Sequence, residues 1–210
     1  MANQQKKVSD AVIKRLPRYF RYLADLKENN VLRISSKALS EKMGFTASQI
    51  RQDLSCFGGF GQQGYGYNVE SLYSELKKIL GVNKSFGIII IGAGNLGQAI
   101  ANYGKFEKRG YFLKGIFDVN KDLIGNKIDG VDIMTMDSLP EFLKNNHVDI
   151  AVLTVPRNVT TVVAEDIVKL GIKGIWNFSA MDIKVPDDVE VENVHLSDSI
   201  MVLGYKIKNN

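Results

Sequence analysis

Residues 86–97 read Phe-Gly-Ile-Ile-Ile-Ile-Gly-Ala-Gly-Asn-Leu-Gly, and this stretch is the strongest indication of the fold of the chain. Its first half, residues 86–91, is a short β-branched apolar run, which is typical of a buried central strand. Residues 98–108 can form a helix, Gly110 breaks that pattern, and residues 112–117 form a second apolar run. The order strand, glycine turn, helix, strand predicts a dinucleotide-binding α/β domain.

The glycine turn has the GxGxxG spacing of dinucleotide sites. Gly92 permits a sharp exit from the strand, Gly94 lets a pyrophosphate approach the backbone, and Gly97 lets helix and strand pack closely. Asp118 closes the second strand, about 20 residues further on, where a carboxylate accepts a hydrogen bond from an adenosine ribose. Because that carboxylate would repel a 2′-phosphate, we predict NAD(H) rather than NADP(H). The alternative is a glycine turn that holds no ligand.

The composition of the 210 residues, 45% hydrophobic and 24% charged, is that of an ordinary globular protein. The chain has no apolar run near 18 residues and no charged-then-apolar leader, so we expect a cytoplasmic protein without a membrane span or secretory signal. Cys56 is the single cysteine, which excludes an internal disulfide framework. We predict that Cys56 is a packed small hydrophobe rather than a redox thiol.

The net charge of +4 is distributed unevenly. Residues 1–85 hold 14 basic and 7 acidic residues, a charge of +7. Residues 86–210 hold 13 basic and 16 acidic residues, a charge of −3. A basic first part indicates a polyanionic partner, although a solvated basic face would give the same count.

Residues 35–56 have the pattern of a helix-turn-helix. Ser35 or Ser36 can cap a helix to Met43, and Gly44 makes a tight turn. Thr46, in capping-box spacing with Gln49, caps the next helix to about Cys56. A longer helix from Ser9 to Glu28 precedes them, with Pro17 expected to break or kink it.

The second helix of such a motif enters the major groove of DNA. Its outward polar residues, which we predict to contact DNA, are Thr46, Ser48, Gln49, Arg51 and Gln52. Residues 57–67 then alternate glycine with aromatic residues, which favours a β-hairpin wing over a flexible linker. A short helix over residues 69–80 follows, and the loop 81–85 is the expected boundary between domains.

After Asp118 the chain alternates strands and helices, which predicts a parallel, doubly wound sheet. The expected strands are 131–134, 149–155 and 174–178, and the expected helices are 138–146, with Ser138 and Glu141 in capping-box spacing, and 156–170. Ligands bind beyond the carboxyl ends of such strands. The residues placed there are Thr154, Val155, Pro156, Asn177 and Phe178, whereas Trp176 is expected in the core. A last helix, with Leu196, Ile200, Leu203 and Ile207 at helical spacing, covers its own domain or a second subunit.

These motifs resemble the Rex family of redox-sensing transcriptional repressors over nearly the whole chain, from Arg15-Leu16-Pro17 to the last helix. The most specific stretches are 48–55, 64–67, 92–97, 154–156 and 171–178. The resemblance implies a winged helix-turn-helix domain in residues 1–82, a Rossmann domain in 83–195 and a domain-swapped helix and tail in 196–210.

The resemblance further implies a homodimer that binds an inverted repeat in operator DNA, AT-rich by expectation, and that NADH releases. NAD⁺ and NADH are then sensed rather than turned over, and the target genes serve NADH reoxidation by fermentation or respiration. Carried over by position, Arg51 contacts bases and Asp118 holds the ribose. Arg21 and Tyr103 join a contact network between the domains.

The site residues predicted on both grounds are as follows. The dinucleotide set is Gly92, Ala93, Gly94, Asn95, Leu96, Gly97, Asp118, Thr154, Val155, Pro156, Asn177 and Phe178. The DNA set is Arg15, Thr46, Ser48, Gln49, Arg51, Gln52, Gln63, Gly64 and Tyr65, and the switch set is Arg21, Tyr103 and His195. No metal site is expected.

Three positions depart from the family pattern. Gln52 stands where the recognition helix usually has lysine, and Gln62-Gln63 stands where the wing usually has a basic pair, so we expect weaker DNA binding with a shallower salt dependence. His195 replaces a common aspartate and cannot supply its charge. We therefore expect a retuned switch, with a pH response near the ordinary histidine pKa of about 6.5, unless His195 has no role.

Two other functions fit parts of the sequence. A dehydrogenase needs a proton donor or acceptor beside its substrate, and the chain offers only His147 and His195 and no second catalytic domain. A helix-turn-helix regulator of another ligand, such as an acyl or sugar phosphate, leaves Asp118 unexplained. We therefore predict a repressor and not an enzyme.

Overall fold

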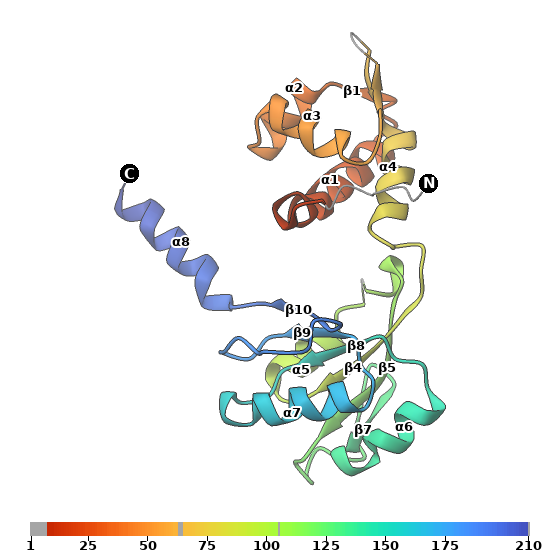
Figure 1. Cartoon of the computed structure of the whole chain (residues 1–210), viewed down its shortest axis with the longest axis vertical. Coiled ribbons are helices and arrows are strands. Elements are labelled where there is room, and N and C mark those ends of the chain that lie inside the picture. The colour runs from red at the N-terminus through yellow and green to blue at the C-terminus, as the bar shows by residue number, and fades with distance from the viewer. Residues whose placement is uncertain (1–7, 63–64, 105, 210) are drawn as a thin grey trace. The chain divides into compact units, whose positions relative to one another are not determined.

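The computed structural model describes residues 8–62, 65–104 and 106–209, and Figure 1 shows its elements. The chain divides into two compact units, Met1–Asn83 and Lys84–Asn210. Among the described residues, no helix combines the length and apolar character needed to cross a membrane.

The first unit is a helix-turn-helix with a small sheet. Its helices are α1 (Asp10–Glu28), α2 (Ser36–Met43), α3 (Ala47–Ser55) and α4 (Val69–Ile79). Its strands β1 (Arg33–Ile34), β2 (Gly61–Gln62) and β3 (Gly66–Asn68) pair antiparallel in the order β1-β3-β2. The core comes from all four helices and includes Leu16, Tyr19, Leu23, Ile50, Leu54, Leu72 and Leu76. The predicted helix pair and hairpin wing are confirmed.

Local capping explains where α2 and α3 begin. The Ser35 hydroxyl accepts from the Ala38 N–H at 3.0 Å, and the Thr46 hydroxyl accepts from the Gln49 N–H at 3.1 Å. Gly44 ends α2 with φ of 70°, in the left-handed region that favours glycine. The sequence therefore places both helices correctly, because each boundary is set by its own residues.

Two predictions for the first unit need correction. Of the two effects expected of Pro17, a break is wrong: α1 is one continuous helix, because the buried residues Leu16, Tyr19 and Leu23 hold both sides of the proline in the core. Cys56 is exposed rather than packed. It follows the last residue of α3, where the chain leaves the core, and its thiol lies 3.5 Å from the Gln52 carbonyl.

The second unit is built on a seven-stranded sheet in the order β10-β9-β8-β4-β5-β7-β6 (Figure 1). The strands are β4 (Phe86–Ile91), β5 (Tyr111–Asp118), β6 (Lys127–Ile128), β7 (Val131–Thr135), β8 (Ile150–Leu153), β9 (Gly174–Asn177) and β10 (Glu190–Asn193). All neighbours pair parallel except β6 and β7. The predicted doubly wound sheet with residues 86–91 at its centre is confirmed, while β6 and β10 were not predicted.

Helices cover both faces of this sheet, because the side chains of β4 alternate between them. Ile89 and Ile91 pack with α6 (Leu139–Asn145) and α7 (Arg157–Lys169), whereas Ile90 packs with α5 (Asn95–Ala101). Two short 3₁₀ turns, η1 (Glu107–Arg109) and η2 (Met136–Ser138), complete the connections.

Two helix predictions for this unit need correction. The helix expected over residues 98–108 ends at Ala101, the last of its residues that is buried against the sheet, and η1 follows separately. The capping box of Ser138 is also wrong: its hydroxyl donates to the Thr135 carbonyl at 2.7 Å, within η2. Because Ser138 belongs to η2, its hydroxyl does not cap α6.

The last helix, α8 (Leu196–Lys208), has no buried residue. Its apolar side chains are more than half exposed, from 54% for Leu203 to 71% for Tyr205. Of the two alternatives for this helix, covering its own domain is therefore wrong.

Candidate nucleotide and DNA sites

The glycine turn after β4 has room for a ligand at one glycine and none at the other two. Gly92 has φ of 102°, and a Cβ there would lie 2.7 Å from the Thr154 carbonyl oxygen. A Cβ on Gly97 would lie 1.9 Å from the Gly92 carbonyl oxygen. A Cβ on Gly94 would meet nothing within 4 Å. Gly92 and Gly97 are thus required by the backbone, while Gly94 faces open space.

Asp118, at the end of β5, lies against this turn. One carboxylate oxygen accepts from the Ala93 N–H at 2.5 Å, and the other accepts from the Asn120 N–H at 2.8 Å. Each oxygen keeps a further acceptor position, so the half-buried carboxylate can still bind hydroxyl groups of a ligand. Val119, the next residue, is 79% exposed and was not predicted as part of this site.

The strands next to β4 bring the other predicted residues to the same edge of the sheet. The Thr154 hydroxyl donates to the Gly92 carbonyl at 2.7 Å, and Val155 and Pro156 lead into α7. Asn95 and Leu96 form the first turn of α5, beyond Gly94.

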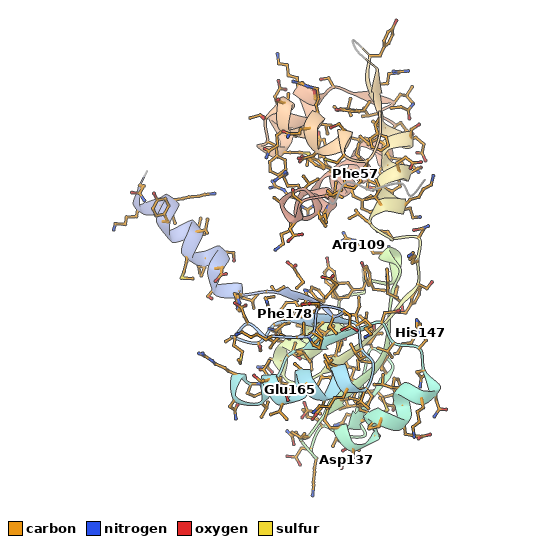
Figure 2. The ribbon with its side chains drawn as sticks, viewed as in Figure 1. Phe57, Arg109, Asp137, His147, Glu165 and Phe178 are labelled. Carbon is orange, nitrogen blue, oxygen red and sulfur yellow. The ribbon has the colours of Figure 1, made fainter. Side chains whose placement is uncertain are left out.

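Asn177 and Phe178, at the end of β9, differ in their freedom to meet a ligand. The Asn177 amide donates to Met181 and Asn193 and accepts from Ser179, and the residue is fully buried. Its side chain therefore holds the loop after β9. Phe178, labelled in Figure 2, is half-buried with its ring centroid 4.6 Å from that of Trp176.

The recognition helix α3 carries its polar residues on one exposed face. Thr46, Ser48, Arg51 and Gln52 are exposed and Gln49 is half-buried, while Ile50 is buried. On the wing, Tyr65 is 69% exposed. The predicted contacts Gln63 and Gly64 lie outside the described residues.

Arg15 has a contact that sequence reasoning did not predict. Its guanidinium donates two hydrogen bonds to Asp53 of α3, at 2.7 and 2.8 Å, and Tyr19 donates a third at 2.7 Å. Burial alone would raise the pKa of the 2%-exposed Asp53, but the bonds from Arg15 and Tyr19 outweigh it and lower that pKa. Burial and Asp53 raise the pKa of Tyr19. The signal available in the sequence was an aspartate three residues after Ile50, on the inward face of α3.

The predicted switch residues are accessible within their own units. Arg21 is exposed on α1, and Tyr103 is 45% exposed with its ring 4.9 Å from that of Phe106. His195 precedes α8, and its Nε2 lies 2.9 Å from a carboxylate oxygen of Asp182, in the loop before β10. His195 therefore has a carboxylate partner in its own chain.

A helix-turn-helix with a wing, joined in one chain to a glycine turn of the dinucleotide type, defines the class of ligand-responsive transcription regulators. Two family models match the corresponding parts: "Putative DNA-binding protein N-terminus" over residues 7–55 and "CoA binding domain" over residues 83–181.

Known relatives identify the family. The chain is 62% identical over 200 residues, 95% of this chain and 89% of the other, to the redox-sensing transcriptional repressor Rex of Caldanaerobacter subterraneus subsp. tengcongensis. A crystal structure of RSP with β-NAD⁺ and operator DNA matches with a TM-score of 0.91 and 59% identity, over 96% of this chain and 93% of that one. The crystal structure of RSP with β-NADH matches with a TM-score of 0.91 and 56% identity, over 97% of this chain and 96% of that one. The chain belongs to the Rex family of redox-sensing transcriptional repressors, and it is therefore a repressor and not an enzyme.

Proposed function

We propose that this protein binds an inverted-repeat operator as a homodimer in the cytoplasm and leaves it when NADH occupies the glycine turn. The observation that carries the proposal is the pairing of the open Gly94 and the Asp118 carboxylate with an exposed recognition helix in the same chain. The regulated genes would be those of NADH reoxidation, by fermentation or respiration.

The geometry of the turn supports a dinucleotide as the ligand. A pyrophosphate can approach the backbone at Gly94, where even a Cβ would have no neighbour. Asp118 would accept from the adenosine ribose, as its position at the turn allows. Coenzyme A, the ligand named by one matching family model, carries a ribose phosphate whose charge the Asp118 carboxylate would repel, so NAD(H) fits better.

The character of α8 supports a dimer. Leu196, Ile200, Leu203 and Ile207 form one apolar stripe, and Met201 and Tyr205 lie on the opposite side at helical spacing, all exposed. A helix that is apolar on opposite sides is normally buried on both. We infer that α8 is exchanged with a second subunit and lies between the two units of that partner.

Binding of DNA would use α3 and the wing of each subunit. Arg51 would read base edges in the major groove, and the wing around Tyr65 would follow the adjacent minor groove of an AT-rich site. Because Gln52 and Gln62-Gln63 lack the usual positive charges, fewer phosphates would be neutralised than in a typical member of the family.

NADH can release the DNA only by binding one dimer conformation more tightly than the other. Arg21, Tyr103 and His195 are the residues that we assign to the contacts that differ between these conformations. NAD⁺, competing for the same turn, would leave the DNA-binding form in place.

The test is fluorescence anisotropy of the full chain on a labelled AT-rich palindromic duplex at fixed salt, titrated with NADH, NAD⁺ or coenzyme A. We expect release by NADH at concentrations where NAD⁺ and coenzyme A have little effect. Binding that ignores NADH, or release by coenzyme A alone, would contradict the proposal.

Gly94→Ala is the matched variant, because its Cβ has space in the free protein but projects where the pyrophosphate would approach. It should keep the wild-type melting temperature and DNA affinity but lose the NADH response by about tenfold or more. An unchanged NADH response would remove the glycine turn from the mechanism.

A further inference from the structure

Arg51 of α3 is held by a residue from the helix before it. Its Nη1 donates a hydrogen bond to the Ser36 hydroxyl at 2.9 Å, across 15 positions of sequence. Both residues line a cavity of about 630 Å³ between α2, α3 and the wing, together with Gly61, Gly66 and Tyr67. The guanidinium therefore lies at a defined place between the recognition helix and the wing.

We propose that Ser36 is a positioning residue for base recognition: its hydroxyl takes one N–H of Arg51 and orients the other donors of the guanidinium toward a base pair. This inference rests on the proposed reading of DNA by Arg51. It assigns to α2 a part in sequence specificity, and not only in docking α3.

The donors of arginine allow both contacts at once. A guanidinium has five N–H groups, and the bond to Ser36 uses one of those on Nη1. Within the described part of the chain, Ser36 is the one hydrogen-bond acceptor that Arg51 contacts. The Nε and Nη2 edge remains for a bidentate contact with O6 and N7 of guanine, the arrangement that distinguishes this base most strongly.

Ser36 is itself well placed for this purpose. It is the first residue of α2, half-buried, and its backbone is fixed by the Ser35 cap on the Ala38 N–H. Tyr67 of β3 lines the same cavity as Arg51, and the charge of Arg51 opposes the rise that burial causes in the pKa of the Tyr67 hydroxyl. An arginine free in solvent would lose more rotamer freedom on reaching a base than one already hydrogen-bonded to α2.

A direct contact between the Ser36 hydroxyl and a DNA phosphate would also make this residue matter for binding. The two roles differ in a measurable way. A phosphate contact strengthens binding to every sequence and adds to the salt dependence, whereas orientation of Arg51 strengthens binding only to the sequence that Arg51 reads.

The experiment compares the affinity of the full-length protein for two duplexes at fixed salt: the tightest palindrome selected from a randomised pool, and its scrambled counterpart. The variants are Ser36→Ala, Ser36→Thr, Arg51→Ala, and the double variant. Ser55→Ala is the control, because Ser55 lines the same cavity but donates to the Gln52 carbonyl within its own helix. Circular dichroism establishes that each variant is folded.

We expect Ser36→Ala to weaken binding to the selected duplex about 3- to 10-fold per subunit, the range of one lost hydrogen bond, and so about 10- to 100-fold for a dimer on the palindrome, with scrambled-duplex affinity and salt slope unchanged. Ser36→Thr should restore the selected affinity, Ser55→Ala should match the wild type, and Ser36→Ala should cost nothing further in the Arg51→Ala background. Equal weakening of binding to both duplexes would overturn the positioning role. It would also be overturned if Ser36→Ala weakened binding as much in the Arg51→Ala background as in the wild type.

The outcome for Arg51→Ala distinguishes base reading by Arg51 from its positioning by Ser36. If it lowers the ratio of selected to scrambled affinity while Ser36→Ala does not, only the positioning role of Ser36 is overturned. If Arg51→Ala leaves that ratio unchanged, base reading by Arg51 is overturned and the inference with it, while release of the DNA by NADH still tests the nucleotide site separately.

Discussion

Replacing Asp53 by asparagine is expected to destabilise the first unit by about 2–4 kcal/mol. The Asp53 carboxylate is 2% exposed and accepts two hydrogen bonds from Arg15 and one from Tyr19, all between 2.7 and 2.8 Å. Asparagine has nearly the same shape but no charge, and its amide nitrogen would face the Arg15 guanidinium. The variant thus leaves a largely buried cation without its counter-charge.

The magnitude follows from the burial of the two partners. Removing one partner of a fully buried ion pair costs about 3–5 kcal/mol. The Arg15 side chain is 20% exposed, so water recovers part of that loss and we take the lower range. Tyr19→Phe removes one donor to the charged carboxylate and leaves the ion pair intact, so about 1.5–3 kcal/mol is expected.

The two units can be followed separately in the full chain. Trp176 is the single tryptophan and lies in β9, so its emission reports the second unit, while hydrogen exchange of α3 amides reports the first. A loss of 2–4 kcal/mol predicts exchange about 30- to 900-fold faster in α3, with no change in the Trp176 transition. The control is Glu70→Gln, which removes the ion pair between Glu70 and Lys27. The two groups lie 2.8 Å apart, a distance similar to that of the Asp53 pair, but their side chains are 60% and 45% exposed. It should leave α3 exchange unchanged.

The same pair predicts an acid dependence. Because the pKa of Asp53 is lower in the folded protein than in the unfolded chain, its stabilisation is complete above the unfolded pKa of about 3.9 and is lost as the pH falls through the folded one. Asp53→Asn should lack this component, so wild type and variant converge at low pH. Equal exchange in α3 of both proteins at pH 7 would show that the Asp53 charge does not stabilise the first unit.

Four further outcomes are expected. Gly97→Ala should lower the melting temperature reported by Trp176, because its Cβ would lie 1.9 Å from the Gly92 carbonyl; an unchanged melt would contradict this. Leu203→Asp should raise the monomer fraction in ultracentrifugation while both units stay folded, and a fully dimeric variant would exclude α8 from the interface. Gln52→Lys should tighten operator binding and steepen its salt slope by about 1 per added contact. A slope identical to that of the wild type would show that the lysine makes no phosphate contact. His195→Asp should alter the NADH response between pH 6 and 8, and an unchanged response would leave His195 without a role.

Much of both units could be predicted because the responsible signals are local. Gly44, Ser35 and Thr46 set the ends of α2 and α3 with bonds that span three or four residues. The strand at residues 86–91 and the glycine turn are specified by composition and by backbone conformations that only glycine adopts readily. The end of α5 at Ala101 and the continuity of α1 across Pro17 depend on packing, and both were predicted wrongly, although the limits of α1 itself were predicted correctly.

The class of protein follows from local patterns in the chain: a helix-turn-helix with a wing, followed by a dinucleotide turn with its acidic residue, in an order and spacing that need no tertiary information. Which polar residues are free for ligands depends instead on how the chain folds. Arg15 pairs with Asp53 across 38 positions, Ser36 holds Arg51 across 15, and Asn177 is committed to its own loop. The physical reason is that a side chain's partner depends on which distant backbone segments the core brings within about 3 Å, and neither periodicity nor spacing contains that information.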